Sequence, residues 1–229
     1  MAPDSPPTKA TVLISGEGSN LQALIDATSN LLPSLKIVRV ISNKAAANGL
    51  NRAKAASIPT AYHNLVSGKY YAKGETDPAV KQQAREKYDT DLVKLILQDE
   101  PDIVICAGWM HILTPKFLDP LAQRDVPIPV INLHPALPGK YDGANAIERA
   151  YNDFQEGKLE DNTTGIMIHY VVKEVDRGEP IVIRKVECKA SETLDELEAR
   201  IHTEEHQLIL EGTQIAIHDL WEARRSKSG

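Results

Sequence analysis

The chain has 229 residues, of which 42% are hydrophobic and 25% are charged, and its net charge is −6. A chain of this length can bury a core of its own as one domain. The negative charge argues against nucleic acid or an acidic membrane as a partner, because both bind mainly through positive charge.

Two further features of the composition concern the compartment. Both cysteines, Cys106 and Cys188, lie in apolar runs typical of strands. This favours packed, reduced thiols over a disulfide framework, so we expect a cytoplasmic protein. No run of 18 apolar residues occurs in the sequence, so we expect no membrane span.

Apolar β-branched runs alternate with helical patterns through the first two thirds of the chain. Near-continuous apolar strands separated by helices predict a mostly parallel sheet with helices on both faces, a Rossmann-like α/β fold. The expected strands are 10–15, 36–42, 59–64, 101–108 and 129–134, and the expected helices are 20–30, 48–57, 78–99, 115–123 and 145–156.

The pattern changes in the last third. Strands expected at 164–172 and 179–188 are separated by only a short turn, which predicts an antiparallel pair near the C-terminus. A final helix is expected to begin near Thr193, where Thr193 and Glu196 have the spacing of a capping box. We therefore expect a single domain over 10–224, between loose tails at 1–9 and 225–229, the first of which does not resemble a signal peptide.

The stretch "LISGEGSNLQAL" has the order strand, glycine turn, helix. Gly16 and Gly18 allow backbone N–H groups and a helix N-terminus to converge on an anion, and Ser19 and Asn20 add polar side chains, of which Asn20 could also cap the helix. Leu21 stands where a dinucleotide fingerprint needs its third glycine, so a small phosphate monoester is the better ligand. The alternative is a capped turn without a ligand.

The stretch "PVINLHP" places an amide and an imidazole in an apolar strand. Asn132 and His134 point to one face because side chains alternate along a strand. Pro135 ends the strand, so His134 lies at its carboxyl end, where open α/β sheets bind ligands. The pair could supply an oxyanion donor and a proton shuttle, or His134 could be a structural histidine bonded to a carbonyl.

A carboxylate follows in the turn "KEVDRGEP". Asp176 lies there, two residues before Gly178. A carboxylate beside an imidazole raises the imidazole pKa and fixes its tautomer. Asp176 could equally be an ordinary turn residue, and spacing alone does not bring it to His134.

Six segments, in order, carry a family resemblance: "VLISGEGSNLQALID", "VISNKAAANGLNRAK", "PDIVICAGWMHILTPKFL", "VINLHPALPGKYDGANAIERA", "TTGIMIHYVVKEVDRGEPIV" and "RIHTEEH". The Asn-x-His-Pro strand and the Asp-x-Gly turn resemble those of formyltetrahydrofolate-dependent formyltransferases. The phosphate turn and the "SNK" segment resemble the phosphoribosylglycinamide formyltransferase branch. The resemblance covers about residues 10–210.

The resemblance implies transfer of a formyl group from N10-formyltetrahydrofolate to the glycyl amine of glycinamide ribonucleotide, a step of purine biosynthesis. It implies that His134 is the general acid/base, that Asn132 donates to the oxyanion, and that Asp176 orients the imidazole and helps to relay a proton. Both partners are small molecules, and no nucleic acid or membrane partner is implied.

The resemblance also implies substrate contacts. The ribonucleotide phosphate would lie on Gly18, Ser19 and Asn20, with His202 and Glu205 near the ribose. The folate would contact Asn132 and Asp176 together with Arg85, Met110, His111, Ile112, Leu113, Val172, Lys173, Glu174 and Val175. Without the resemblance, Arg85 would be taken for a solvated arginine on a charged helix.

The sequence departs from the family pattern at two places, and it contains one histidine pair that could suggest a metal site. His111 stands where many bacterial relatives have arginine, and "HPALPGKYDG" replaces the more frequent "HPSLLPKYPG" after the catalytic strand. The i, i+4 pair His202 and His206 lacks the Glu after the first His that a zinc protease needs, so we expect no metal.

Other functions stay open on sequence grounds. The closest rivals are formyltetrahydrofolate hydrolase and methionyl-tRNA formyltransferase, which usually carry an N-terminal regulatory domain and a basic C-terminal domain, respectively. We expect neither domain here, and the net charge of −6 does not suit tRNA. A rival of another class is a catalytically silent module that binds folate or a phosphosugar.

Overall fold

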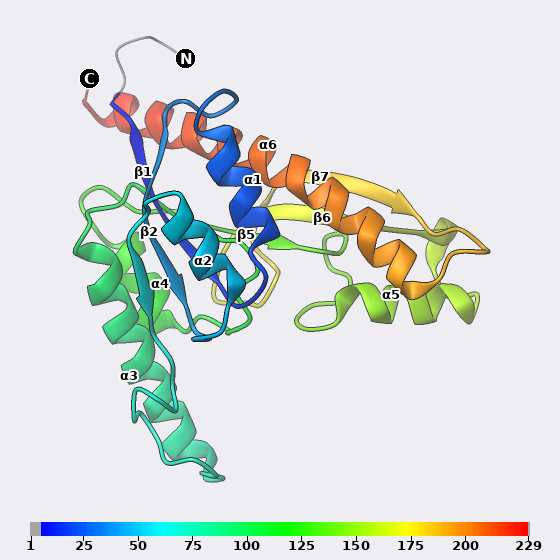
Figure 1. Ribbon diagram of the computed structural model, residues 1–229, viewed down its shortest axis with the longest axis horizontal. Coiled ribbons are helices and arrows are strands. Elements are labelled where there is room, and N and C mark those ends of the chain that lie inside the picture. The colour runs from blue at the N-terminus through cyan, green and yellow to red at the C-terminus, as the bar shows by residue number, and fades with distance from the viewer. Residues whose placement is uncertain (1–5, 229) are drawn as a thin grey trace.

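The computed structural model describes residues 6–228. Its centre is a seven-stranded sheet in the order β3-β2-β1-β4-β5-β6-β7 (Figure 1). The strands are β1 Thr8–Ile14, β2 Leu35–Ser42, β3 Thr60–Tyr62, β4 Ile103–Cys106, β5 Val130–His134, β6 Thr163–Tyr170 and β7 Pro180–Glu187. The helices are α1 Ser19–Ala27, α2 Asn48–Ala55, α3 Pro78–Leu97, α4 Pro115–Ala122, α5 Ala146–Gln155 and α6 Leu194–Ser228, with a short 3₁₀ turn at Glu160–Asn162.

Strand direction follows the predicted pattern. The strands β1 to β5 pair in parallel, β6 is antiparallel to β5, and β7 is antiparallel to β6. This confirms the predicted Rossmann-like sheet with an antiparallel pair near the C-terminus. Glu196 accepts from the Thr193 N–H at 2.8 Å and donates its own N–H to the Thr193 hydroxyl at 3.3 Å, so the predicted capping box begins α6.

Two hydrophobic cores lie on opposite faces of the sheet. One packs the strands against α1, α2, α5 and α6, and the other packs them against α3 and α4. In β5, Ile131 and Leu133 belong to the first core, whereas Val130 belongs to the second. By the strand alternation, Asn132 and His134 therefore share a face, as predicted, and this face is the one that α3 and α4 cover.

Regular secondary structure extends beyond the expected domain bounds of 10–224. Thr8 is already in β1, where its N–H donates to the carbonyl of Ser34 at 2.6 Å. The helix α6 continues through 225–228 because Trp221 anchors its last turns, donating to the Thr8 hydroxyl at 2.8 Å. The remaining residues of the expected tails, 1–5 and 229, lie outside the described residues.

The helix α6 is 35 residues long and runs in Figure 1 from near α5, past β6, β7 and α1, to the start of β1. Among the described residues, no helix has the length and apolar character needed to span a membrane. Where α6 passes over β6, Gly212 allows the helix to lie directly on Ile168: a Cβ at that position would be 2.7 Å from the Cβ of Ile168.

We expect Gly212→Ala to lower the free energy of unfolding. Overpacking against Ile168 costs about 1–3 kcal/mol, whereas the better helix propensity of alanine returns only about 1 kcal/mol. Urea denaturation measures the difference, with Gln214→Ala on the exposed side of the same turn as the control. Equal or greater stability of Gly212→Ala would contradict the close packing of α6 on β6.

Candidate active site

The polar side chains of β5 meet those of β6 at the carboxyl end of the parallel strands. His134 is the last residue of β5 and is 3% exposed. The register of the β5–β6 pair sets His169 opposite Asn132, and the Asn132 Nδ2 lies 3.2 Å from the His169 Nε2. The other nitrogen of His169, Nδ1, lies 2.9 Å from the backbone carbonyl of Tyr170.

Asp176 completes this cluster. Its Oδ2 lies 3.5 Å from the His134 Nδ1, and its Oδ1 lies 3.5 Å from both the Asn132 Nδ2 and the His169 Nε2. The N–H of Gly143 donates to Oδ2 at 2.7 Å. The structure therefore brings together the three residues that the sequence predicted, Asn132, His134 and Asp176, and adds His169.

The glycine of the Asp-x-Gly turn has a steric reason. A Cβ at Gly178 would be 1.5 Å from the carbonyl oxygen of Tyr170, so only glycine lets the turn fold down onto the end of β6. Asp176 itself has φ +54°, a left-handed conformation that is uncommon outside glycine. The turn thus returns over the strands and places its carboxylate above the β5 side chains.

Burial and charge oppose each other in this cluster. Burial lowers the pKa of His134 below its ordinary value, although Asp176 and the backbone of Lys140 act to raise it. The sequence predicted that the carboxylate would raise the pKa of His134; the net direction is the opposite, because desolvation is the larger effect. Burial alone would raise the pKa of Asp176, but His169, the Gly143 N–H and His134 hold that pKa below its usual range. The resting pair at neutral pH is a neutral imidazole and a carboxylate.

The second ring nitrogen of His134 is free to exchange a proton with a ligand. Nε2 is buried and has no hydrogen-bond partner among the described residues. His134 lines a cavity of about 310 Å³ together with Asn132, His169 and Asp176. A buried imidazole nitrogen without a protein partner can accept or donate a proton at a bound ligand.

This first cavity contains most of the predicted folate residues. Besides Asn132 and Asp176, it is lined by Met110, His111, Ile112, Leu113, Val172, Lys173 and Val175. The largely apolar walls suit a flat heterocycle. Glu174 and Arg85 do not line it.

Arg85 and His111 lie together at the edge of α3. The guanidinium of Arg85 lies over the Tyr88 ring, 5.6 Å from its centroid, and Nη1 is buried without a partner among the described residues. Burial, followed by the charge of Arg85, lowers the pKa of His111 to about 4. His111 is therefore neutral at pH 7, and the cations near it are Arg85 and Lys44.

A second cavity of about 440 Å³ lies over the N-terminus of α1. All five predicted ribonucleotide residues line it: Gly18, Ser19, Asn20, His202 and Glu205. Gly18 begins the helix in the left-handed region, φ +74°, and no side chain caps the first turn, so its N–H groups are available to an anion. Gly18 also packs against Gly49, whose Cα would be 2.6 Å from a Cβ at position 18.

The predicted capping role of Asn20 is wrong. Its Nδ2 instead donates to the Glu205 carboxylate at 3.0 Å, across 185 residues of sequence. Glu205 is 5% exposed, and burial raises its pKa despite the hydrogen bond from Asn20. The pair joins α1 to α6 at the wall of the second cavity.

The two cavities adjoin. They share Gly108, Met110, Leu133, Pro135, Asn145 and Ala146, and His134 lies between the shared Leu133 and Pro135. Two ligands bound side by side would therefore meet beside the imidazole, which is the arrangement that a group transfer requires.

Sequence reasoning missed two groups of this site. His169 was not singled out because it lies in an apolar strand where a core residue is the ordinary interpretation. Lys44 lines the second cavity and offers a cation near the helix N-terminus; its position in the quoted "SNK" segment was the available signal. No cluster of three or more possible metal ligands occurs within residues 6–228, and the lack of a metal requirement stays a prediction.

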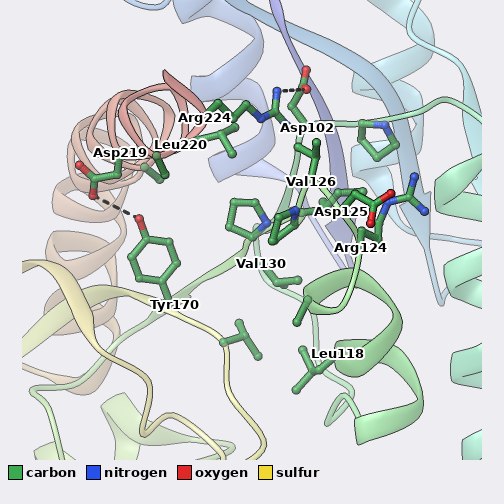
Figure 2. A pocket seen from close by; sticks show the side chains of 18 of the residues that line it. Asp102, Leu118, Arg124, Asp125, Val126, Val130, Tyr170, Asp219, Leu220 and Arg224 are labelled. Atoms are coloured by element: carbon green, nitrogen blue, oxygen red, sulfur yellow. Dashed lines mark hydrogen bonds and ion pairs between the residues drawn. The ribbon is translucent and has the colours of Figure 1, made fainter. Parts of the chain in front are cut away.

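A larger cavity, of about 810 Å³, lies elsewhere. Figure 2 shows it between the C-terminal part of α6, α4 and the amino ends of β4 and β5, opposite the catalytic edge of the sheet. Three of its charged groups already have partners: Asp219 accepts from Tyr170 at 3.3 Å, and Arg224 pairs with Asp102 at 2.6 Å. It contains no histidine or cysteine, so the smaller pair of cavities is the candidate active site.

Comparison with known proteins agrees with this geometry. The formyl transferase family model matches residues 8–213. The chain belongs to the formyl transferase family. The phosphoribosylglycinamide formyltransferase of Schizosaccharomyces pombe is 44% identical over 91% of this chain and 95% of the relative. That of Escherichia coli is 36% identical over 86% of this chain and 81% of the relative.

Solved structures give the same result. The phosphoribosylglycinamide formyltransferase from Anaplasma phagocytophilum superposes with a TM-score of 0.73 at 32% identity, covering 92% of this chain and 87% of that one. That from Bacillus halodurans has a TM-score of 0.73 at 26% identity, covering 90% and 93%. The family resemblance inferred from the sequence is confirmed.

Proposed function

We propose that the chain transfers the formyl group of N10-formyltetrahydrofolate to the glycyl amine of glycinamide ribonucleotide, giving formylglycinamide ribonucleotide and tetrahydrofolate. The observation that carries this proposal is the junction of two ligand cavities beside His134 and Asp176. The names of the relatives agree with this de novo purine biosynthesis step.

Each substrate suits one cavity. The phosphate of the ribonucleotide would take the free N–H groups of α1 and the Ser19 hydroxyl, with Lys44 nearby and Glu205 toward the ribose hydroxyls. The pteridine of the folate would lie between 110–113 and 172–176, and Arg85 would face its acidic tail. The glycyl amine and the formyl carbon then meet at the wall shared by both cavities.

The chemistry follows from the protonation states. The neutral amine attacks the formyl carbon, a C–N bond forms, and the carbonyl electron pair moves to oxygen, where Asn132 donates a hydrogen bond. His134, neutral at rest, accepts the proton that the attacking nitrogen loses. The imidazolium so formed is stabilised by Asp176 at 3.5 Å.

The second half returns the proton. Collapse of the tetrahedral intermediate restores the carbonyl and breaks its bond to folate N10. That nitrogen takes a proton, which the His134 imidazolium supplies as general acid. The proton passes either directly or by a relay that includes Asp176. The imidazole is then neutral again, so one residue serves both steps without net change.

The rival functions are separated by one assay. A 10-formyl folate is followed spectrophotometrically with and without glycinamide ribonucleotide. We expect loss of formyl folate only when the ribonucleotide is present. Loss without an acceptor would favour the hydrolase, and no loss under either condition would favour a silent binding module.

The phosphate site makes a selective prediction. Ser19→Ala should raise the Michaelis constant for the ribonucleotide much more than that for the folate, because a hydrogen bond to a charged group contributes about 1.5–3 kcal/mol. Ser29→Ala, an exposed hydroxyl just beyond the other end of α1, is the matched control. An equal rise in both constants would place the phosphate elsewhere.

His134 and Asp176 should act as one unit. We expect His134→Ala and Asp176→Asn each to lower turnover by orders of magnitude, and the double variant to be little worse than the weaker single variant. Because Asp176 raises the pKa of His134, Asp176→Asn should also move the His limb of the pH–rate profile to lower pH. Steady-state kinetics across pH test this, with the exposed His218→Ala as the control. Losses that multiply in the double variant would show independent roles.

A further inference from the structure

Two segments meet over the catalytic carboxylate. The loop 136–145, which follows β5, reaches the turn 171–179, which joins β6 to β7. They touch at adjacent positions: the Gly143 N–H donates to Asp176 Oδ2 at 2.7 Å, and Arg177 Nε and Nη2 bind Asp142 Oδ2 at 2.8 and 2.7 Å. Arg177 is therefore the direct neighbour of Asp176, which carries the carboxylate, and Asp142 is the direct neighbour of Gly143, which donates to it.

The loop side of this contact is itself fixed. Arg149 of α5 donates to the backbone carbonyls of Tyr141 and Asp142, at 2.5 and 2.7 Å. The Tyr141 hydroxyl donates to Asp153 of the same helix at 2.7 Å. The Arg177 side chain also lies across the loop, since a Cβ at Gly139 would be 3.2 Å from its Nη1. Arg177 thus ties the catalytic turn to a loop that α5 holds in place.

The turn has a particular need for such a tie. Asp176 has φ +54°, and on the loop side Tyr141 has φ +51°. Non-glycine residues keep this conformation only where surrounding contacts over-determine it. The Arg177–Asp142 pair is 52% and 32% exposed, so as an isolated ion pair it would contribute little to stability. Because the pair lies beside Asp176, its main effect is on the placement of that carboxylate.

We propose that Arg177 and Asp142 are positioning residues that hold the Asp176 carboxylate against His134 by clamping the catalytic turn to the loop after β5. Neither side chain lines either ligand cavity, whereas Gly143 and Asp176 line the first. The clamp acts on the reaction through the placement of Asp176, and the charge of Asp142 also acts directly to raise the pKa of His134. This inference rests on the role proposed above for Asp176.

The test compares variants that open the clamp with one that removes an ion pair elsewhere. Arg177→Ala should lower kcat about ten-fold or more, since small misplacements of catalytic groups are costly. Both Michaelis constants should stay within about two-fold, because only placement of Asp176 changes. The His limb of the pH–rate profile should move to lower pH, as Asp176 supports the imidazole less well. Arg177→Lys should restore part of kcat.

The matched control is Arg184→Ala on β7. Arg184 also pairs with two carboxylates, Glu204 at 2.9 Å and Glu211 at 3.0 Å, but lies away from both cavities. It should leave kcat and the pH profile unchanged. Urea denaturation of every variant separates loss of fold from loss of placement.

Three results would overturn the proposal. One is an unchanged kcat and pH profile in Arg177→Ala while Asp176→Asn is impaired, which would leave the role of Asp176 intact and remove the clamp alone. A second is a rise in one Michaelis constant that accounts for the whole loss, since this would make Arg177 a binding residue. The third is full activity of Asp142→Asn. This variant removes the charge of the side chain but keeps its shape, so it tests the clamp even if Arg177→Ala does not fold. A fully active Asp176→Asn would instead refute the proposed mechanism itself.

Discussion

The antiparallel pairing of β6 with β5 is the constraint on which the site depends. Its register sets His169 opposite Asn132 and Met167 opposite His134, so the two imidazoles and the amide share one region of the sheet. Side chains alternate along a strand, so a slip of one residue would turn His169 into the opposite core. The direction of β6 also matters, because the chain leaves it at Tyr170 and must fold back over the strand face. Gly178 makes that return possible because it lies so close to the carbonyl of Tyr170 that no side chain would fit. The return places Asp176 beside the other catalytic residues.

Desolvation then decides the charge state of this cluster. Burial favours the neutral imidazole at His134, whereas Asp176 keeps its charge because its oxygens face His169, the Gly143 N–H and Asn132. A carboxylate held in this way costs less to bury than an isolated one. It also stabilises an imidazolium that exists only during the reaction. The same geometry therefore leaves the resting base free to accept a proton and lowers the energy of its protonated form.

Much of the fold, and part of the site, could be predicted from local patterns. Apolar strands that alternate with helices predicted the sheet, and the alternation of β5 predicted that Asn132 and His134 share a face. The parts that could not be predicted depend on contacts distant in sequence. His169 looks like a core residue until its partner strand is known. The Asn20–Glu205 hydrogen bond joins positions 185 residues apart, and the net pKa of His134 depends on burial that the sequence does not reveal.

The helix α6 explains how groups from distant parts of the chain keep a fixed geometry. It contributes Glu205 to the nucleotide cavity, where Asn20 ties it to α1, and it lies on Ile168 of β6 through Gly212. Its last turns are held to β1 by Trp221. A single rigid element thus contacts the strand that leads into the phosphate turn and the strand that carries His169. Because transfer between two bound substrates requires their reacting atoms to be aligned closely, rigidity between these halves of the sheet is as necessary to the proposed reaction as the imidazole itself.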